Sequence, residues 1–133
     1  MTTELFWLTL TMGLAASLWI PFIVLVNTTS AGQAVDNGLP RYSDMTRAAQ
    51  LANRAHINLI EQGMPFAALV ILAHALGVSS AATVAAAIAF FWLRLAHAGV
   101  MLWVNRQIPI RPIIFTAGWV CCVVFAVEIL RLG

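Results

Sequence analysis

Hydrophobic residues fill long stretches of this chain, and polar residues interrupt them at only a few places. A membrane-spanning helix needs about 20 consecutive, mainly apolar residues. The pattern predicts helices over residues 4–26, 44–76, 80–104 and 112–132. The segments after the second and third helices are short, so neighbouring helices should run antiparallel. We therefore expect an all-α integral membrane protein, a single domain over residues 1–133 built as an antiparallel bundle of transmembrane helices.

The expected second helix is longer than a membrane requires. A helix over residues 44–76, with Ser43 as its N-cap, would be about 50 Å long, whereas the hydrocarbon core is about 30 Å thick. Only its second half, from Gly63 to Leu76, is strongly apolar. The polar first half must either project from the membrane or lie against protein.

The composition supports a membrane location. Hydrophobic residues make up 62% of the 133 residues and charged residues 9%, whereas charged residues make up about 25% of a soluble domain. The net charge of +2 is small and dispersed, which is not typical of a protein that binds nucleic acid. The short chain without lysine favours a bacterial inner membrane.

The positions of the basic residues predict an orientation. The segments after the first and third helices, with the starts of the helices that follow them, carry most of the arginines: Arg41, Arg47, Arg54, Arg106 and Arg111. Positively charged loops stay on the cytoplasmic side. We therefore expect loops 1 and 3 in the cytoplasm and both termini outside.

Polar residues of the second helix fall on one face. At 100° per residue, a stripe within about 60° contains a row of charged, amide and proline positions. This row is Arg47, Gln50, Arg54, Asn58, Glu61 and Pro65. A face of the third helix also carries Arg94, His97, Met101 and Asn105, and Arg111 begins the fourth helix on the same side. The two faces should meet at one membrane depth.

Charged groups at this depth cost several kcal/mol unless they are paired or hydrated, and they commonly line a ligand site or pathway. One interpretation is an internal network in which Glu61 neutralises Arg54 or Arg94. The other is an anionic ligand that balances the surplus of arginine over glutamate. We predict no metal site, because the histidines lack the spacing of zinc motifs.

These segments resemble the MAPEG family, the membrane-associated proteins in eicosanoid and glutathione metabolism. RAHINLIEQGMPF, residues 54–66, is similar to the family signature R-A-H-x-N-x-x-E-x-x-x-P-F. RLAHAGVM, residues 94–101, resembles an R-x-x-H-x-x-x-Y segment, and PIR, residues 109–111, resembles the entrance to the family's last helix.

The resemblance implies a homotrimer that binds glutathione between neighbouring subunits on the cytoplasmic side. By position, the glutathione-binding residues would be Arg54, Asn58, Glu61, Arg94 and His97. Arg111 would be the catalytic residue, facing the glutathione thiol. A guanidinium beside the sulfur would lower the thiol pKa from about 8.5 and stabilise the nucleophilic thiolate. The implied activity is a glutathione transferase or peroxidase that acts on apolar electrophiles or hydroperoxides from the lipid.

Departures from the family pattern keep an alternative open. Met101 stands where the family has tyrosine, Ile57 where arginine is frequent, and Pro112 where a hydroxyl side chain can occur. A methionine can pack but offers no hydroxyl. The alternative is a MAPEG-fold membrane binding or structural protein that has lost efficient glutathione chemistry. A small four-helix drug exporter is a further hypothesis, although the first helix has only Glu4 at its edge.

Overall fold

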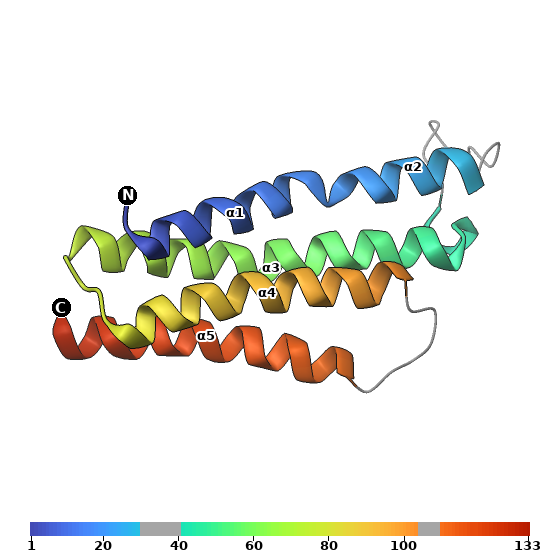
Figure 1. Cartoon of the computed structure of the whole chain (residues 1–133). Coiled ribbons are helices and arrows are strands. Elements are labelled where there is room, and N and C mark those ends of the chain that lie inside the picture. The colour runs from blue at the N-terminus through green and yellow to red at the C-terminus, as the bar shows by residue number, and fades with distance from the viewer. Residues whose placement is uncertain (30–40, 104–109) are drawn as a thin grey trace.

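The computed structural model describes residues 1–29, 41–103 and 110–133. The helices are α1 (Thr3–Ser17), α2 (Trp19–Thr29), α3 (Arg47–Ala75), α4 (Ala81–Trp103) and α5 (Ile110–Leu132), with a 3₁₀ turn, η1 (Tyr42–Asp44). α1 and α2 follow one another as a single rod, and successive rods alternate in direction (Figure 1). Among these described residues, four helical spans are long and apolar enough to cross a membrane. The protein is therefore an all-helical integral membrane protein, as the hydrophobic pattern predicts.

The bundle has two distinct ends (Figure 1). Both termini and the α3–α4 connection lie at one end, which we call the termini end. The last turns of α2 and α4 and the first turns of α3 and α5 lie at the other, which we call the arginine end. Residues 30–40 of the expected first loop, together with Asn105, Arg106 and Pro109, lie outside the described residues.

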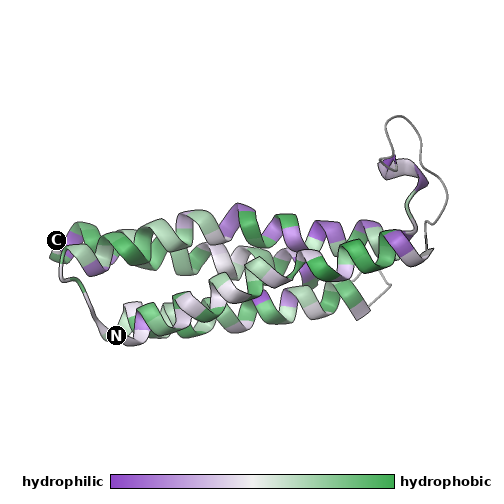
Figure 2. Cartoon of the chain, turned by 90° about the horizontal axis from the view of Figure 1, so that it is seen from above, coloured by the Kyte–Doolittle hydropathy of each residue, from purple (hydrophilic) through white to green (hydrophobic). Residues whose placement is uncertain are grey.

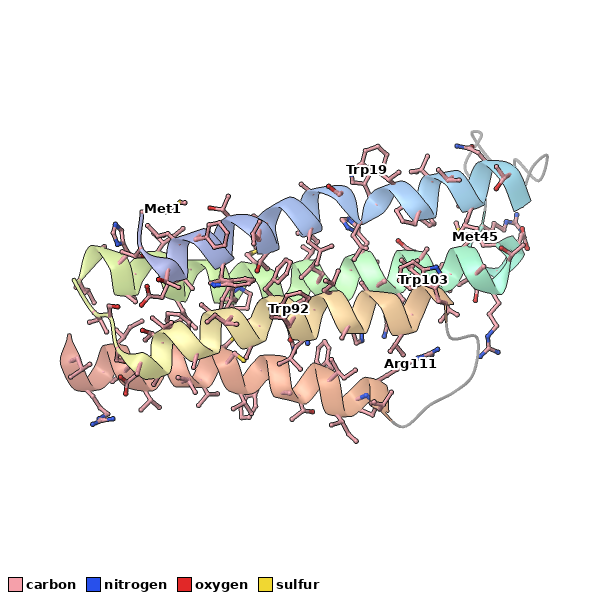
Figure 3. The ribbon with its side chains drawn as sticks, in the orientation of Figure 1. Met1, Trp19, Met45, Trp92, Trp103 and Arg111 are labelled. Carbon is pink, nitrogen blue, oxygen red and sulfur yellow. The ribbon has the colours of Figure 1, made fainter. Side chains whose placement is uncertain are left out.

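The expected first helix is divided at Leu18. Pro21 lies in the first turn of α2, and its ring has no N–H to donate to the carbonyl of Ser17, four residues earlier. α1 accordingly ends at Ser17, and the Leu18 N–H bonds the Leu14 carbonyl at 2.9 Å. Trp19, the first residue of α2, points away from the bundle (Figure 3).

α3 begins later than expected, and the prediction that Ser43 caps it is wrong. Thr46 is the N-cap, and its hydroxyl accepts a bond from the Ala49 N–H at 3.4 Å. Ser43 instead lies in η1 and donates to Asp44 at 3.1 Å. At 29 residues, α3 is about 44 Å long and still exceeds the hydrocarbon thickness of about 30 Å.

The core consists of two apolar clusters separated by a polar layer. In the cluster nearer the termini end, the rings of Phe66 and Phe90 stack at 3.8 Å, and Phe125 meets Phe66 edge-on at 5.6 Å. The cluster nearer the arginine end contains Ala15, Leu18, Ala55, Leu59, Ala98 and Met101. Between the two lie Thr11, Gln62, Arg94 and Gly118, one from each rod. Each rod thus contributes a polar or small residue at the same level.

The outward faces of the helices are strongly apolar, and Figure 2 shows hydrophobic residues along most of each ribbon. Trp92 and Trp119, for example, expose more than half of their surface in the monomer. Burying such side chains in hydrocarbon is favourable, by about 25 cal/mol for each Å² removed from water. Lipid or other membrane helices must therefore cover these faces.

Glu4 connects two helices at the termini end. Its carboxylate is buried, and Oε1 accepts hydrogen bonds from the hydroxyls of Ser79 at 2.6 Å and Thr83 at 2.9 Å. Ser79 and Thr83 flank the start of α4, where negative charge is stabilised by the helix dipole. The bonds hold the first turn of α1 against α4.

We expect Thr83→Val to lower the thermal stability of the protein in detergent. The substitution keeps the side-chain shape but leaves Glu4 and the Ser80 N–H without the Thr83 hydroxyl, a loss of about 1–3 kcal/mol. Thr9→Val is the matched control, because the exposed Thr9 hydroxyl bonds only the Leu5 carbonyl of its own helix. Equal melting temperatures by circular dichroism for the two variants would contradict the connecting role of Thr83.

Candidate functional site

Arg94 is the most deeply buried charged residue of the described bundle, with 1% of its surface exposed. Its Nη2 donates to the carbonyls of Ile114 at 3.1 Å and Phe115 at 3.5 Å, both in the first turns of α5. The guanidinium carbon also lies 5.4 Å and 5.5 Å from the ring centres of Phe90 and Phe115. Arg94 thereby fastens α4 to α5.

These contacts compensate in part for the burial of a guanidinium at this depth. Placing an arginine near the centre of a bilayer costs about 2.5–3.5 kcal/mol. A hydrogen bond to a charged group contributes about 1.5–3 kcal/mol, and a guanidinium beside an aromatic ring about 0.5–2 kcal/mol. The two carbonyls and two rings offset part of the burial, while Nε and Nη1 of Arg94 have no hydrogen-bond partner among the described residues.

Gly118 makes room for this arrangement. A methyl group on Gly118 would collide with Nη2 of Arg94 and would lie 2.7 Å from Oε1 of Gln62. Gln62 reaches the same part of α5, and its Nε2 donates to the Phe115 carbonyl at 3.1 Å. Side chains from α3 and α4 thus converge on one turn of α5, and glycine lets them approach its backbone.

A pocket of about 410 Å³ opens on the arginine-end side of this layer. It lies between α3, α4 and α5 and is lined by Leu51, Arg54, Asn58, His97, Met101, Arg111, Pro112 and Phe115. We call it the His97 pocket. Its volume is within the range of about 300–1,000 Å³ that is usual for small-molecule sites.

The fastening of α5 sets the position of Arg111 in this pocket. Arg111 lies one turn before Ile114 and Phe115, so the three residues share a helix face. Figure 3 shows Arg111 at the start of α5, at the end of the bundle where α4 finishes at Trp103. His97, 4% exposed, approaches from α4, with its ring 6.4 Å from that of Phe115.

A second pocket, of about 290 Å³, adjoins the first at the arginine end. Its lining is Tyr42, Arg47, Gln50, Leu51, Arg54 and Arg111, and we call it the Arg47 pocket. Leu51, Arg54 and Arg111 belong to both pockets. The two spaces are therefore neighbours along the same face of α3.

The structure brings together four of the six site residues expected from the sequence: Arg54, Asn58, His97 and Arg111. Arg94 lies beneath the His97 pocket rather than in its wall. Glu61 is exposed on the outer side of α3 and lines neither pocket. A direct role for Arg94 and Glu61 in binding stays a prediction.

Several residues in or beneath the two pockets were missed by the sequence analysis. Gln62, rather than Glu61, continues the inward row of Arg54 and Asn58, because it follows Asn58 by four residues. Tyr42 is the single tyrosine of the chain, and its place between Arg41 and Arg47 was the available signal. Nothing in the sequence pattern distinguished Phe115 from its apolar neighbours.

The alternative of an internal salt-bridge network is not observed among residues 1–29, 41–103 and 110–133. Within those ranges no carboxylate pairs with Arg54 or Arg94, and Glu128 pairs at 3.0 Å with Arg131 at the termini end. The arginine end therefore combines several guanidinium groups with two adjoining pockets. Such a site is complementary to a small anion.

The bundle and its basic pockets define a small helical membrane protein with an anion-complementary site at one end. The sequence model of the MAPEG family matches residues 5–131, nearly the whole chain. The chain belongs to this family of membrane proteins of eicosanoid and glutathione metabolism. Searches among curated proteins and among solved structures returned no match.

We expect Gly118→Ala to destabilise the protein, because the added methyl group would displace Arg94 and Gln62. Overpacking of this kind typically costs about 1–3 kcal/mol. Gly13→Ala is the matched control, since nothing lies within 4 Å of a methyl group there. Thermal unfolding in detergent measures both variants, and an unchanged melting temperature for Gly118→Ala would contradict the close approach of Arg94.

Proposed function

We propose that the protein is a membrane-bound, glutathione-dependent transferase or peroxidase that acts on apolar electrophiles or lipid hydroperoxides. The observation that carries the proposal is the His97 pocket, in which Arg54, Asn58, His97 and Arg111 meet. These residues come from the three segments that resemble the family motifs, and the chain is a member of that family. Glutathione is the cosubstrate that this chemistry fits.

The polar groups of glutathione complement this site. The tripeptide carries two carboxylates, one ammonium and a thiol. Guanidinium groups bind carboxylates with two parallel hydrogen bonds, and Arg54 is available for this on α3. Asn58 can bond the peptide groups, and Glu61 is suited to the ammonium. His97 completes the wall on α4, while Arg94 holds α5 in place from below.

Arg111 is the group proposed to stabilise the thiolate. A positive charge within about 4–6 Å of a thiol favours its ionised form. In the transferase reaction the thiolate attacks an electrophilic carbon, and the leaving group departs with the bonding electrons. In the peroxidase reaction it attacks a hydroperoxide oxygen, the O–O bond breaks, and an alcohol leaves. The resulting sulfenic acid condenses with a second glutathione to give a disulfide and water.

The apolar substrate would arrive from the lipid along α5. A shallow pocket of about 390 Å³ on this helix is lined by Pro112, Ile113, Thr116, Ala117 and Val120. Pro112 also lines the His97 pocket. A hydrophobic electrophile in this groove would lie next to the proposed thiolate. In the proposed orientation, the arginine end faces the cytoplasm.

Glu61 supports assembly as a homotrimer, with glutathione bound between subunits. Glu61 precedes Gln62 directly in the sequence, so it lies at the level of the polar layer in the middle of the bundle. Its side chain is nevertheless exposed. An acidic residue facing hydrocarbon at this depth costs about 2.5–3.5 kcal/mol. A neighbouring subunit would cover Glu61 and turn it from a lipid-facing charge into part of the site.

The alternative function is a MAPEG-fold binding protein without efficient glutathione chemistry. Met101 favours it, because this side chain lines the His97 pocket where the family motif has a tyrosine hydroxyl. Such a protein would bind glutathione without ionising its thiol, so the two functions differ in a spectroscopic signal.

Mixing the purified protein with glutathione at neutral pH should produce the ultraviolet absorbance of a thiolate. We expect Arg111→Ala to reduce this signal about tenfold or more, because loss of the charge raises the pKa of the bound thiol by about one unit or more. Arg131→Ala is the control, since Arg131 pairs with Glu128 at the termini end. A full signal in Arg111→Ala would reject this role, and binding without any signal would favour the alternative.

The oligomer is tested by light scattering of the purified protein, with the detergent contribution subtracted. We expect a protein mass of three chains of 14.4 kDa each. Glu61→Arg should dissociate the trimer, because it places a bulkier charge of opposite sign at the proposed subunit contact. A monomeric wild-type protein that still forms the thiolate would contradict a site shared between subunits.

A further inference from the structure

The Arg47 pocket differs chemically from the His97 pocket. Its side chains are two guanidiniums of α3, Arg47 and Arg54, with Arg111, the Tyr42 hydroxyl and the Gln50 amide. Among the described residues, no carboxylate lines it. The family motifs do not include Tyr42, Arg47 or Gln50. The pocket therefore suits a negatively charged part of a ligand that has no positively charged group next to it in the same ligand.

Gln50 holds Tyr42 at this pocket. The Nε2 of Gln50 donates to the carbonyl of Tyr42 at 3.0 Å and to that of Met45 at 3.1 Å. These bonds tie η1 to the first turns of α3. The turn thus presents an aromatic hydroxyl beside Arg47, and a hydroxyl can donate a hydrogen bond to a carboxylate.

The two ends of glutathione are chemically unequal. The γ-glutamyl end bears both a carboxylate and an ammonium, whereas the glycine end bears a carboxylate alone. The ammonium is repelled by positive charge and does not fit a pocket lined by guanidinium groups. Electrostatics therefore directs the glycine end toward Arg47.

The spacing along α3 agrees with this direction. Arg47 precedes Arg54 by two helical turns, which is about 10 Å along the axis. An extended tripeptide spans about 10 Å. Since the two pockets share Arg54 and Arg111, a tripeptide with its thiol at Arg111 can extend from one pocket into the other.

We propose that the Arg47 pocket binds the glycine carboxylate of glutathione, with Arg47 and the Tyr42 hydroxyl as its specific ligands. This inference rests on the proposed function and adds to it a second subsite. Tyr42 then supplies an aromatic hydroxyl to the ligand from η1, although α4 has Met101 where the family motif has tyrosine.

The test compares glutathione with its monoethyl ester, which lacks the charge of the glycine carboxylate, by calorimetric titration of the purified full-length protein. We expect the wild type to bind glutathione about tenfold more tightly than the ester, equivalent to about 1.4 kcal/mol. Arg47→Gln should remove this difference by weakening glutathione alone. Tyr42→Phe should reduce the difference by about threefold, and Arg47→Lys should restore part of it.

The controls separate this subsite from the proposed function. Arg131→Gln, at the other end of the bundle, should preserve the preference for glutathione over the ester. If glutathione binds but Arg47→Gln weakens both ligands equally, or neither, the glycine subsite is refuted and the proposed function stands. If the wild type binds neither ligand, the proposed function fails as well. Arg47→Gln could instead lose co-purified phosphatidylglycerol while its affinities for glutathione and for the ester stay unchanged. That result would assign the pocket to a lipid phosphate and overturn the proposal.

Discussion

A buried guanidinium determines how this bundle is put together. Arg94 reaches across from α4 to the carbonyls of Ile114 and Phe115 and lies between two aromatic rings. Because a charge in hydrocarbon tolerates few other arrangements, α5 can hardly slide or rotate against α4 without losing these bonds. Gly118 makes this arrangement possible, since any larger residue would keep Arg94 away from the backbone of α5.

The arginine end of the molecule, with its two pockets, depends on that constraint. Arg111 lies one turn from the carbonyls that Arg94 engages, so its approach to Arg54 and His97 follows from the register of α5. The polar layer itself lies between two apolar clusters. In the proposed function, the polar layer below and the two basic pockets above would form a preorganised anion site, and preorganisation reduces the entropy lost on binding.

Much of the fold could be predicted from the sequence, and the reasons are local. Long apolar stretches specify spanning helices because backbone polar groups cannot remain unpaired in lipid. Helical periodicity also placed Arg54 and Asn58 on one face, and both line the His97 pocket. The exact start of a helix was less predictable where two neighbouring residues could each act as its N-cap. Thr46, and not Ser43, caps α3, because the chain first makes a 3₁₀ turn stabilised by Gln50.

The sequence by itself determined the membrane class, the helical periodicity and the family resemblance, because these depend on composition and on neighbours along one helix. Only the tertiary structure decided which polar residues face one another. It placed Arg94 beneath the pocket rather than in its wall, directed Glu61 outward, and brought Tyr42 to Arg111. These placements depend on the rotation of each helix about its own axis. That rotation is set by contacts between distant segments, such as the bonds from Arg94 and Gln62 to α5.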